Sequence, residues 1–237
     1  MNLHVRRASL RLTLLPFLAT LGLVFLAACA AEEEEFATNL PDDAYPLEDM
    51  LLDLEDLPLA MENANTNTFD NGEWAQLFDV ENLRGKVNQL EARGRIIGAV
   101  REFSWEEPFT HLGGPALITI QSTLYADVES AEDSMSLYCG SLINERTVTD
   151  YTDFWAADIG DGAEGFIVGQ PTTEIGRLVE TVVCFRTGRI VHAVAQNGLE
   201  GTEDIALGVR IATRMYELVR TVFADLDLEA VAEAEES

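Results

Sequence analysis

The chain has 237 residues, of which 47% are hydrophobic, and a formal net charge of −27 at pH 7. This length suits one large domain, or one domain with tails. The acidic balance excludes the basic footprint that is typical of nucleic-acid-binding domains, so we expect no nucleic-acid partner.

The start of the chain has the pattern of a bacterial export signal. A positive start and an apolar run lead to two small residues before a cysteine: Arg6, Arg7 and Arg11, then residues 12–26, then Ala27, Ala28 and Cys29. The sequence Leu26-Ala27-Ala28-Cys29 resembles the lipobox of bacterial lipoproteins, which implies cleavage before Cys29 and lipid on its thiol. A retained transmembrane helix is the alternative, although Pro16 interrupts the run and its length is at the lower end of the spanning range.

The resemblance to a lipoprotein implies the location of the chain. Two acyl chains on Cys29 give stable membrane anchoring, whereas one chain gives marginal binding. We expect the protein in the cell envelope, held to the outer face of the cytoplasmic membrane or to an outer membrane. The paired arginines, Arg6 and Arg7, fit export through either the general or the twin-arginine route.

Most of the negative charge lies in the flanks of the chain. Residues 29–82 hold 16 acidic residues and no Lys or Arg, and residues 224–237 hold six acidic residues and no base. Blocks of like charge usually stay solvated, so we favour a tether over a site for Ca²⁺ or a cationic partner. The predicted parts are a signal peptide (1–28), an acidic flexible tether (29–46), an α+β globular domain (47–223) and an acidic tail (224–237).

The first half of the domain alternates helical and extended patterns. Residues 47–57 alternate acids with leucines, which fits a short helix, and residues 60–72 are rich in Asn and Thr, which fits a loop or an edge strand. Residues 82–93 have a helical apolar spacing with Gly94 as the residue that ends the helix. Extended runs follow at 95–105 and 116–125.

The second half adds a helix, a hairpin and a final helix. Asp127 is placed to cap a helix over residues 128–142, and residues 147–165 are expected to be mostly loop before a short strand at 166–168. Strands are expected at 178–186 and 189–196, joined by a turn at Thr187-Gly188 that sets Cys184 opposite Val191. A final helix is expected from about residue 202 to 223.

Both faces of the predicted hairpin are apolar, so both need a cover. The expected architecture is an α+β fold with an antiparallel sheet and helices on both faces, which is an α-β-α sandwich.

Once Cys29 is assigned to lipid, Cys139 and Cys184 form an even pair in an oxidising compartment, which predicts a disulfide. The alternative is a nucleophilic Cys139 with a histidine partner.

Four motifs occur between residues 94 and 223: Leu117–Ile120 leading into Asp127–Ala131, then Ile159–Ala163, then Val183–Val191, and a final Ala-rich helix. Together they resemble the PsbP-like fold of exported lipoproteins and bacterial sensor domains. The resemblance implies a binding or accessory module without a fixed ligand and mostly without enzymatic activity.

Few residues of this chain are candidates for ligand binding or catalysis. Trp105, Phe109, His111 and Trp155 lie at element ends or in loops, where they could line a ligand cleft. His192 falls on an apolar face and is interpreted as a core histidine. Five of the bases, Arg84, Lys86, Arg93, Arg95 and Arg101, fall within eighteen residues, and we interpret them as a solvated helix face and strand edge, met by the acidic flanks.

The sequence therefore favours a membrane-anchored extracytoplasmic lipoprotein that acts as a non-catalytic binding or accessory domain. We expect no catalytic residues, metal or cofactor, and the expected partners are the membrane through Cys29 and another envelope protein or a small ligand. The alternatives are a tethered hydrolase with Cys139 and His192 as nucleophile and base, or a carrier of lipid or another hydrophobic cargo.

Overall fold

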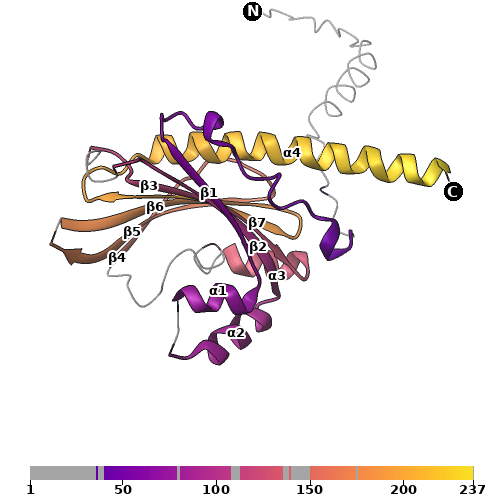
Figure 1. The fold of residues 1–237 in the computed structure, drawn as a ribbon, viewed down its shortest axis with the longest axis horizontal. Helices are drawn as coiled ribbons and strands as arrows, with labels where there is room; N and C mark the ends of the chain where they lie inside the picture. Colours follow the sequence, from indigo (N-terminus) through magenta and orange to yellow (C-terminus); the bar gives the residue numbers. More distant parts are fainter. Residues whose placement is uncertain are drawn as a thin grey trace, which may run out of the picture. The chain divides into compact units, whose positions relative to one another are not determined.

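An antiparallel sheet is the central element of the computed structural model, which describes residues 36, 40–78, 81–107, 113–135, 139, 150–174 and 176–236. Its strand order is β1-β2-β3-β7-β6-β5-β4 (Figure 1). The strands are β1 (Asn63–Phe69), β2 (Arg95–Ser104), β3 (Leu117–Tyr125), β4 (Asp150–Phe154), β5 (Ala163–Thr173), β6 (Gly176–Thr187) and β7 (Ile190–Leu199). The predicted α+β fold with an antiparallel sheet is confirmed.

Helices of very different length accompany the sheet. They are α1 (Asn71–Phe78), α2 (Leu83–Ala92), α3 (Val128–Met135) and α4 (Ile205–Glu236), with 3-10 turns η1 (Asp42–Ala44) and η2 (Leu54–Asp56). In Figure 1, α4 runs along one side of the sheet, and α1, α2 and α3 lie on the other side. Gly94 ends α2 with a φ of 74°, and Asp127 accepts a hydrogen bond from the Ser130 amide at 2.7 Å, both as predicted.

Alternate residues of β6 and β7 enter two different cores. Val183, Phe185, Ile190 and Val194 pack with Ile211, Met215 and Val219 of α4. Their neighbours along the strands, Val182, Cys184, Val191 and Ala193, pack with Ala131 and Met135 of α3. Both faces of the central strands are therefore buried, which explains why their sequences are apolar without alternation.

The pairing within this hairpin differs from the prediction by two residues. Gly188 and Arg189 form the turn, so Thr187 lies opposite Ile190 and Cys184 lies opposite Ala193. Gly188 has a φ of 57°, and a type II′ turn requires glycine at the first of its two residues, not at the second. Because side chains alternate along a strand, a displacement of two residues leaves each residue on its predicted face.

The predicted boundary between tether and domain at residue 46 is wrong. Phe36 and Tyr45 are 7% and 6% exposed, and the rings of both lie against Phe223, with centroid distances of 5.1 and 6.5 Å. Residues 40–57, called here the acidic segment, join the core on the α4 side of the sheet. The acidic residues before Leu47 suggested a tether, whereas the apolar Phe36 and Tyr45 among them pack into the core.

The acidic segment also lacks the short helix expected over residues 47–57. Residues 47–50 form turns, residues 51–53 are irregular, and Leu47, Met50, Leu51 and Leu52 are all buried. A regular helix would turn some of these side chains away from the sheet, whereas this irregular course buries all four.

The predicted acidic tail at residues 224–237 is helical through residue 236. Helix α4 continues to Glu236 without a break at Phe223. No Gly or Pro occurs between residues 209 and 236, and Ala, Leu and Glu are strong helix formers. Acidity alone was therefore a poor signal for the end of the helix.

Helix α1, which the sequence analysis missed, and the full length of strand β5, which was expected only at residues 166–168, have recognisable causes. Helix α1 begins with a capping box, in which the Glu73 amide donates to Asp70 and the Asp70 amide donates to Glu73. Strand β5 continues past Pro171 to Thr173. Its register with β6 shifts between Gly169 and Thr172, and a strand tolerates a proline at such an irregularity. Strand β4 likewise replaces part of the loop expected at residues 147–165.

The predicted disulfide between Cys139 and Cys184 is confirmed. The two Cα atoms lie 5.9 Å apart, and both cysteines are buried in the core beside α3. Small neighbours of Cys184 on β7, Ala193 and Ala195, leave room for this approach. Within the described ranges, no helix is long and apolar enough to cross a membrane.

Removing the disulfide is predicted to lower stability strongly. It connects cysteines 45 residues apart, and a closed loop of that length restricts the unfolded chain by about 4 kcal/mol. Urea unfolding of Cys139→Ala/Cys184→Ala should show this loss, while Cys29→Ser, which leaves the bridge, should unfold like the wild type. A loss below about 1 kcal/mol would contradict the prediction.

Candidate functional site

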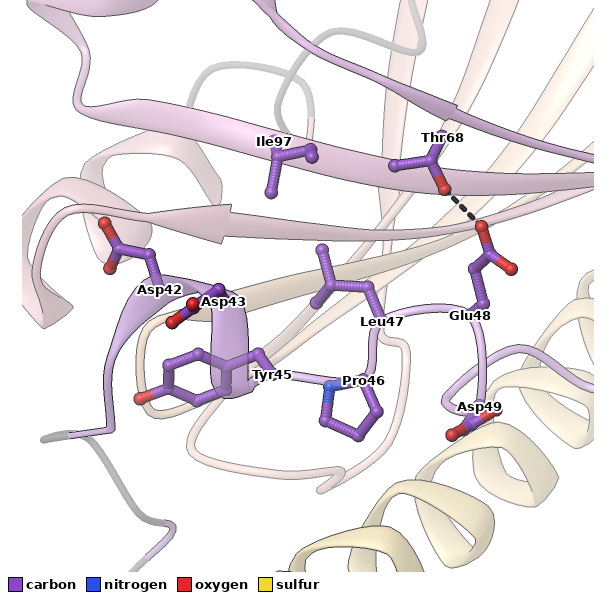
Figure 2. A pocket seen from close by; sticks show the side chains of 9 residues that line it. All are labelled: Asp42, Asp43, Tyr45, Pro46, Leu47, Glu48, Asp49, Thr68 and Ile97. Carbon is purple, nitrogen blue, oxygen red and sulfur yellow. Dashed lines mark hydrogen bonds between the residues drawn. The ribbon is translucent and has the colours of Figure 1, made fainter.

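An open hollow lies between the acidic segment and the edge of the sheet. It has a volume of about 400 Å³. Its lining side chains, drawn in Figure 2, are Asp42, Asp43, Tyr45, Pro46, Leu47, Glu48, Asp49, Thr68 and Ile97. We call it the acidic hollow, because four of these nine residues carry carboxylates.

One wall of the acidic hollow belongs to the sheet. Thr68 is in β1, the strand at the edge, and Ile97 is in the neighbouring strand β2. The Thr68 hydroxyl donates to Glu48 Oε1 at 2.6 Å, which joins the two walls. This bond fixes the Glu48 carboxylate beside the edge strand.

Arg101 holds the middle of the acidic segment against the sheet. Its Nη1 donates to the carbonyl oxygens of Leu51 and Leu52 at 3.0 and 2.8 Å and to Asp53 at 2.5 Å. Its Nε donates to Thr66 Oγ1 of β1 at 2.7 Å. One guanidinium therefore connects strand β2 both to the acidic segment and to the edge strand.

Arg189 and Arg214 hold the two ends of the acidic segment. Arg189 donates to Asp42, and its guanidinium lies 5.2 Å from the centre of the Tyr45 ring. Arg214 of α4 donates to Asp56 at 3.5 Å. Burial raises the pKa of Tyr45, and the nearby Arg189 opposes this rise. The acids of this segment thus meet three arginines of the domain, of which only Arg101 belongs to the basic cluster that was expected to meet the acidic flanks.

The lining of the acidic hollow is polar at its ends and apolar between them. In the view of Figure 2, Asp42 and Asp43 lie at one end, Glu48 and Asp49 at the other, and Leu47 and Ile97 between them. Among the described residues, no group of three or more His, Cys, Asp or Glu is arranged to hold a metal ion. This lining suits an ammonium or guanidinium group on an apolar stem better than a metal ion.

The predicted cleft of Trp105, Phe109, His111 and Trp155 is only partly covered by the structure, since Phe109 and His111 lie outside the described residues. Trp105 follows β2 and donates from Nε1 to the Pro115 carbonyl at 3.0 Å. Trp155 follows β4 and is 78% exposed. Strands β2 and β4 are five strand spacings apart, roughly 24 Å, so the structure does not bring Trp105 and Trp155 together.

His192 is a satisfied core histidine. Its Nδ1 lies 2.9 Å from the Ser122 hydroxyl, its Nε2 lies 2.8 Å from the Thr187 hydroxyl, and its ring stacks on Phe185. Complete burial lowers its pKa to about 3, so the imidazole is neutral at physiological pH. Both ring nitrogens of His192 therefore have hydrogen-bond partners within the core.

The alternative of a hydrolase with Cys139 and His192 is contradicted. The Cys139 sulfur is bonded to Cys184, and a disulfide sulfur is not a thiolate nucleophile. Cys184 also belongs to the core beside α3, whereas the side chain of His192 shares the α4 face with its alternate neighbours Ile190 and Val194. The sheet therefore separates the disulfide from the imidazole.

The interpretation of the basic cluster as solvated is wrong for Arg95. This side chain is 3% exposed, donates to Asn71 Oδ1 at 2.8 Å and to the Phe69 carbonyl at 3.2 Å, and lies over the Trp74 ring. Burial lowers its pKa to about 10. Arg95 connects α1 to the sheet, and Arg101 connects the acidic segment to it, so both have structural roles.

The sequence analysis missed the acidic hollow because it assigned part of the lining to a flexible tether. A signal was present, since Tyr45, Pro46 and Leu47 place apolar side chains between two pairs of acids. Alternation of this kind is typical of a segment that packs on a surface with its carboxylates outward.

Comparisons with known proteins add little. No protein-family model matches this chain, and no curated protein matches it. Among solved structures, the extracellular domain of PknH from Mycobacterium tuberculosis is similar to it, with a TM-score of 0.44 and 11% sequence identity. That alignment covers 80% of this chain and 99% of the PknH domain. A similarity this distant assigns neither family nor activity.

Glu180 gives a prediction for the pH dependence of stability. It is 6% exposed, and burial raises its pKa to about 7, although Asn197 donates to it at 3.3 Å. Because the folded pKa exceeds the unfolded value, Glu180 destabilises the fold increasingly as pH rises from about 4.5 to about 7, by up to about 3 kcal/mol.

The variant Glu180→Gln should remove this effect while keeping the hydrogen bond from Asn197. In thermal unfolding, its Tm should match the wild type at pH 4 and exceed it at pH 8, whereas Glu129→Gln on the exposed face of α3 should change neither. Equal Tm differences at pH 4 and pH 8 would show that Glu180 does not hold a proton in the fold.

Proposed function

We propose that this chain is a lipid-anchored, extracytoplasmic, non-catalytic binding domain whose ligand carries a cationic group on an apolar stem. The export signal and Cys29 support the anchor, and the Cys139–Cys184 disulfide supports an oxidising compartment. We also propose that its sheet, with α4 on one side and α3 on the other, is the α-β-α sandwich of the PsbP-like fold.

The observation that carries the proposed ligand class is the lining of the acidic hollow. Carboxylates at both ends attract a positive charge, and Leu47 and Ile97 offer apolar contact between them. Asp42 is already engaged by Arg189, so Asp43, Glu48 and Asp49 remain as the principal anionic groups. A polar and open hollow of this kind is a poor container for lipid, which makes the hydrophobe carrier the weaker alternative.

The anchor is tested by lipid labelling in a bacterial host. Cells grown with a labelled fatty acid should yield labelled full-length product with its N-terminus at Cys29. The variant Cys29→Ser should lose the label completely, and Cys139→Ser, the matched control, should keep it. Label on Cys29→Ser, or no label on the wild type, would overturn the lipoprotein proposal.

The ligand class is tested with cadaverine, a diamine whose two ammonium groups are joined by five methylene groups. In NMR titrations, amide shifts should saturate and should be largest at the acidic hollow. Asp43→Asn/Asp49→Asn should weaken binding about fivefold, since two exposed ion pairs contribute about 1 kcal/mol together.

The control for charge alone is Glu129→Gln/Glu132→Gln, which removes two carboxylates from the exposed side of α3. This variant should bind cadaverine as the wild type does. If both double variants weaken binding equally, or if shifts spread over the whole surface, the acidic hollow is not a binding site.

A further inference from the structure

The free edge of β1 is built to accept another strand. Strand β1 stands at the end of the sheet and pairs with β2 over seven consecutive residues, from Asn63 opposite Ser104 to Phe69 opposite Gly98. In the part of the chain that the structure describes, its other edge has no strand partner. Every second residue of such an edge points its amide and carbonyl outward.

The features that usually protect an edge strand are missing from β1. Its sequence, Asn63-Ala64-Asn65-Thr66-Asn67-Thr68-Phe69, contains no charged residue and no proline, and its pairing with β2 has no bulge. The opposite edge strand β4 is shorter and carries Asp150 and Asp153. Protection at one edge and its absence at the other indicate that β1 is open for pairing.

Side-chain contacts on both faces of β1 also hold this strand in place. Thr66 accepts from Arg101, and Thr68 donates to Glu48, so the acidic segment fixes one side of the strand. On the other side, the Phe69 ring packs on Trp74 of α1 at a centroid distance of 5.6 Å. A strand already held in extended form loses little further entropy when a partner pairs with it.

The charges around β1 select the occupant. Glu62 precedes the strand, Asp70 follows it, Glu48 accepts a hydrogen bond from Thr68, and Asp49 lines the same acidic hollow. Two arginines contact β1, and both are already engaged: Arg101 is paired with Asp53, and Arg95, which donates to the Phe69 carbonyl, is buried. A second copy of this chain would bring a net charge of −27 and no base in its own β1, so a basic partner is favoured.

We propose that an extended segment of another protein, with a lysine or arginine at every second residue, pairs with β1. Side chains opposite Thr66 and Thr68 lie about 5 Å from them, so one basic side chain reaches the acidic hollow. The partner class rests on the proposed function, because it identifies that hollow as the pocket for the basic side chain. The main-chain pairing rests on β1 alone.

The test uses the full chain in detergent and the capped peptide TKTKVKTK as the probe. Hydrogen exchange should slow at residues 63–69 when the peptide binds. Two further peptides carry N-methyl groups on alternate residues, one on the odd set and one on the even set. Only one set faces β1, so one of these peptides should lose at least tenfold in affinity and the other should bind as before.

Two variants separate the edge from the acidic hollow. Asn65→Lys/Asn67→Lys adds charges of the same sign as the peptide to β1, and should weaken peptide binding at least tenfold without changing cadaverine binding. Asp43→Asn/Asp49→Asn should weaken both ligands, and Glu129→Gln/Glu132→Gln should weaken neither.

The outcomes that overturn the proposal are distinct from those that overturn the proposed function. Equal binding of the two N-methylated peptides, or no protection of residues 63–69, means attraction without strand pairing and overturns the edge proposal alone. If the chain forms concentration-dependent dimers in which β1 is protected from hydrogen exchange, a second copy is the occupant, and this result also overturns the edge proposal. Failure of cadaverine together with the peptide overturns the ligand class itself.

Discussion

The guanidinium of Arg101 is the contact on which this structure depends most. It is mostly buried, and arginine stays charged under all ordinary conditions, so it requires acceptors. The acidic segment supplies three of them, two carbonyl oxygens and the Asp53 carboxylate, and β1 supplies the fourth, Thr66 Oγ1. Removing the guanidinium leaves these acceptors without their donor, at about 1–3 kcal/mol for each one that stays buried.

The rest of the N-terminal packing follows from this contact. With Leu51 and Leu52 held against the sheet, the acidic segment runs antiparallel to α4, so that Tyr45 lies near Phe223 and Asp56 near Arg214. The same course places Leu47 and Ile97 on opposite walls of the acidic hollow and Glu48 beside Thr68 (Figure 2). The proposed ligand site and the rigidity of β1 are thus consequences of how the segment is held.

Features that depend on local chemistry were predictable from the sequence. Gly94 and Asp127 delimit their helices because helix ends need particular residues, and the two faces of the hairpin follow from strand alternation. The Asn- and Thr-rich run at residues 60–72 was open to interpretation as an edge strand, and it contains β1. The disulfide followed from the even number of cysteines left once Cys29 was assigned to lipid.

Features that depend on distant partners were not predictable from the sequence. The sequence around Asp42, Asp53 and Asp56 does not indicate that these acids pair with Arg189, Arg101 and Arg214. Residues up to 46 therefore had the composition of a tether, and residues 47–57 that of a short helix. Arg95 likewise looked solvated until α1 and Trp74 covered it. The acidic hollow was missed for the same reason, because it exists only when residues 42–49 fold against β1 and β2.

The central claim, that Arg101 holds the acidic segment on the sheet, is tested most directly by hydrogen exchange of the full chain. The account predicts slow exchange at residues 47–57 in the wild type, and fast exchange there in Arg101→Gln with α4 unchanged. Arg84→Gln, which removes an exposed arginine from α2, should exchange like the wild type. Fast exchange of residues 47–57 in the wild type, or slow exchange in Arg101→Gln, would contradict the account.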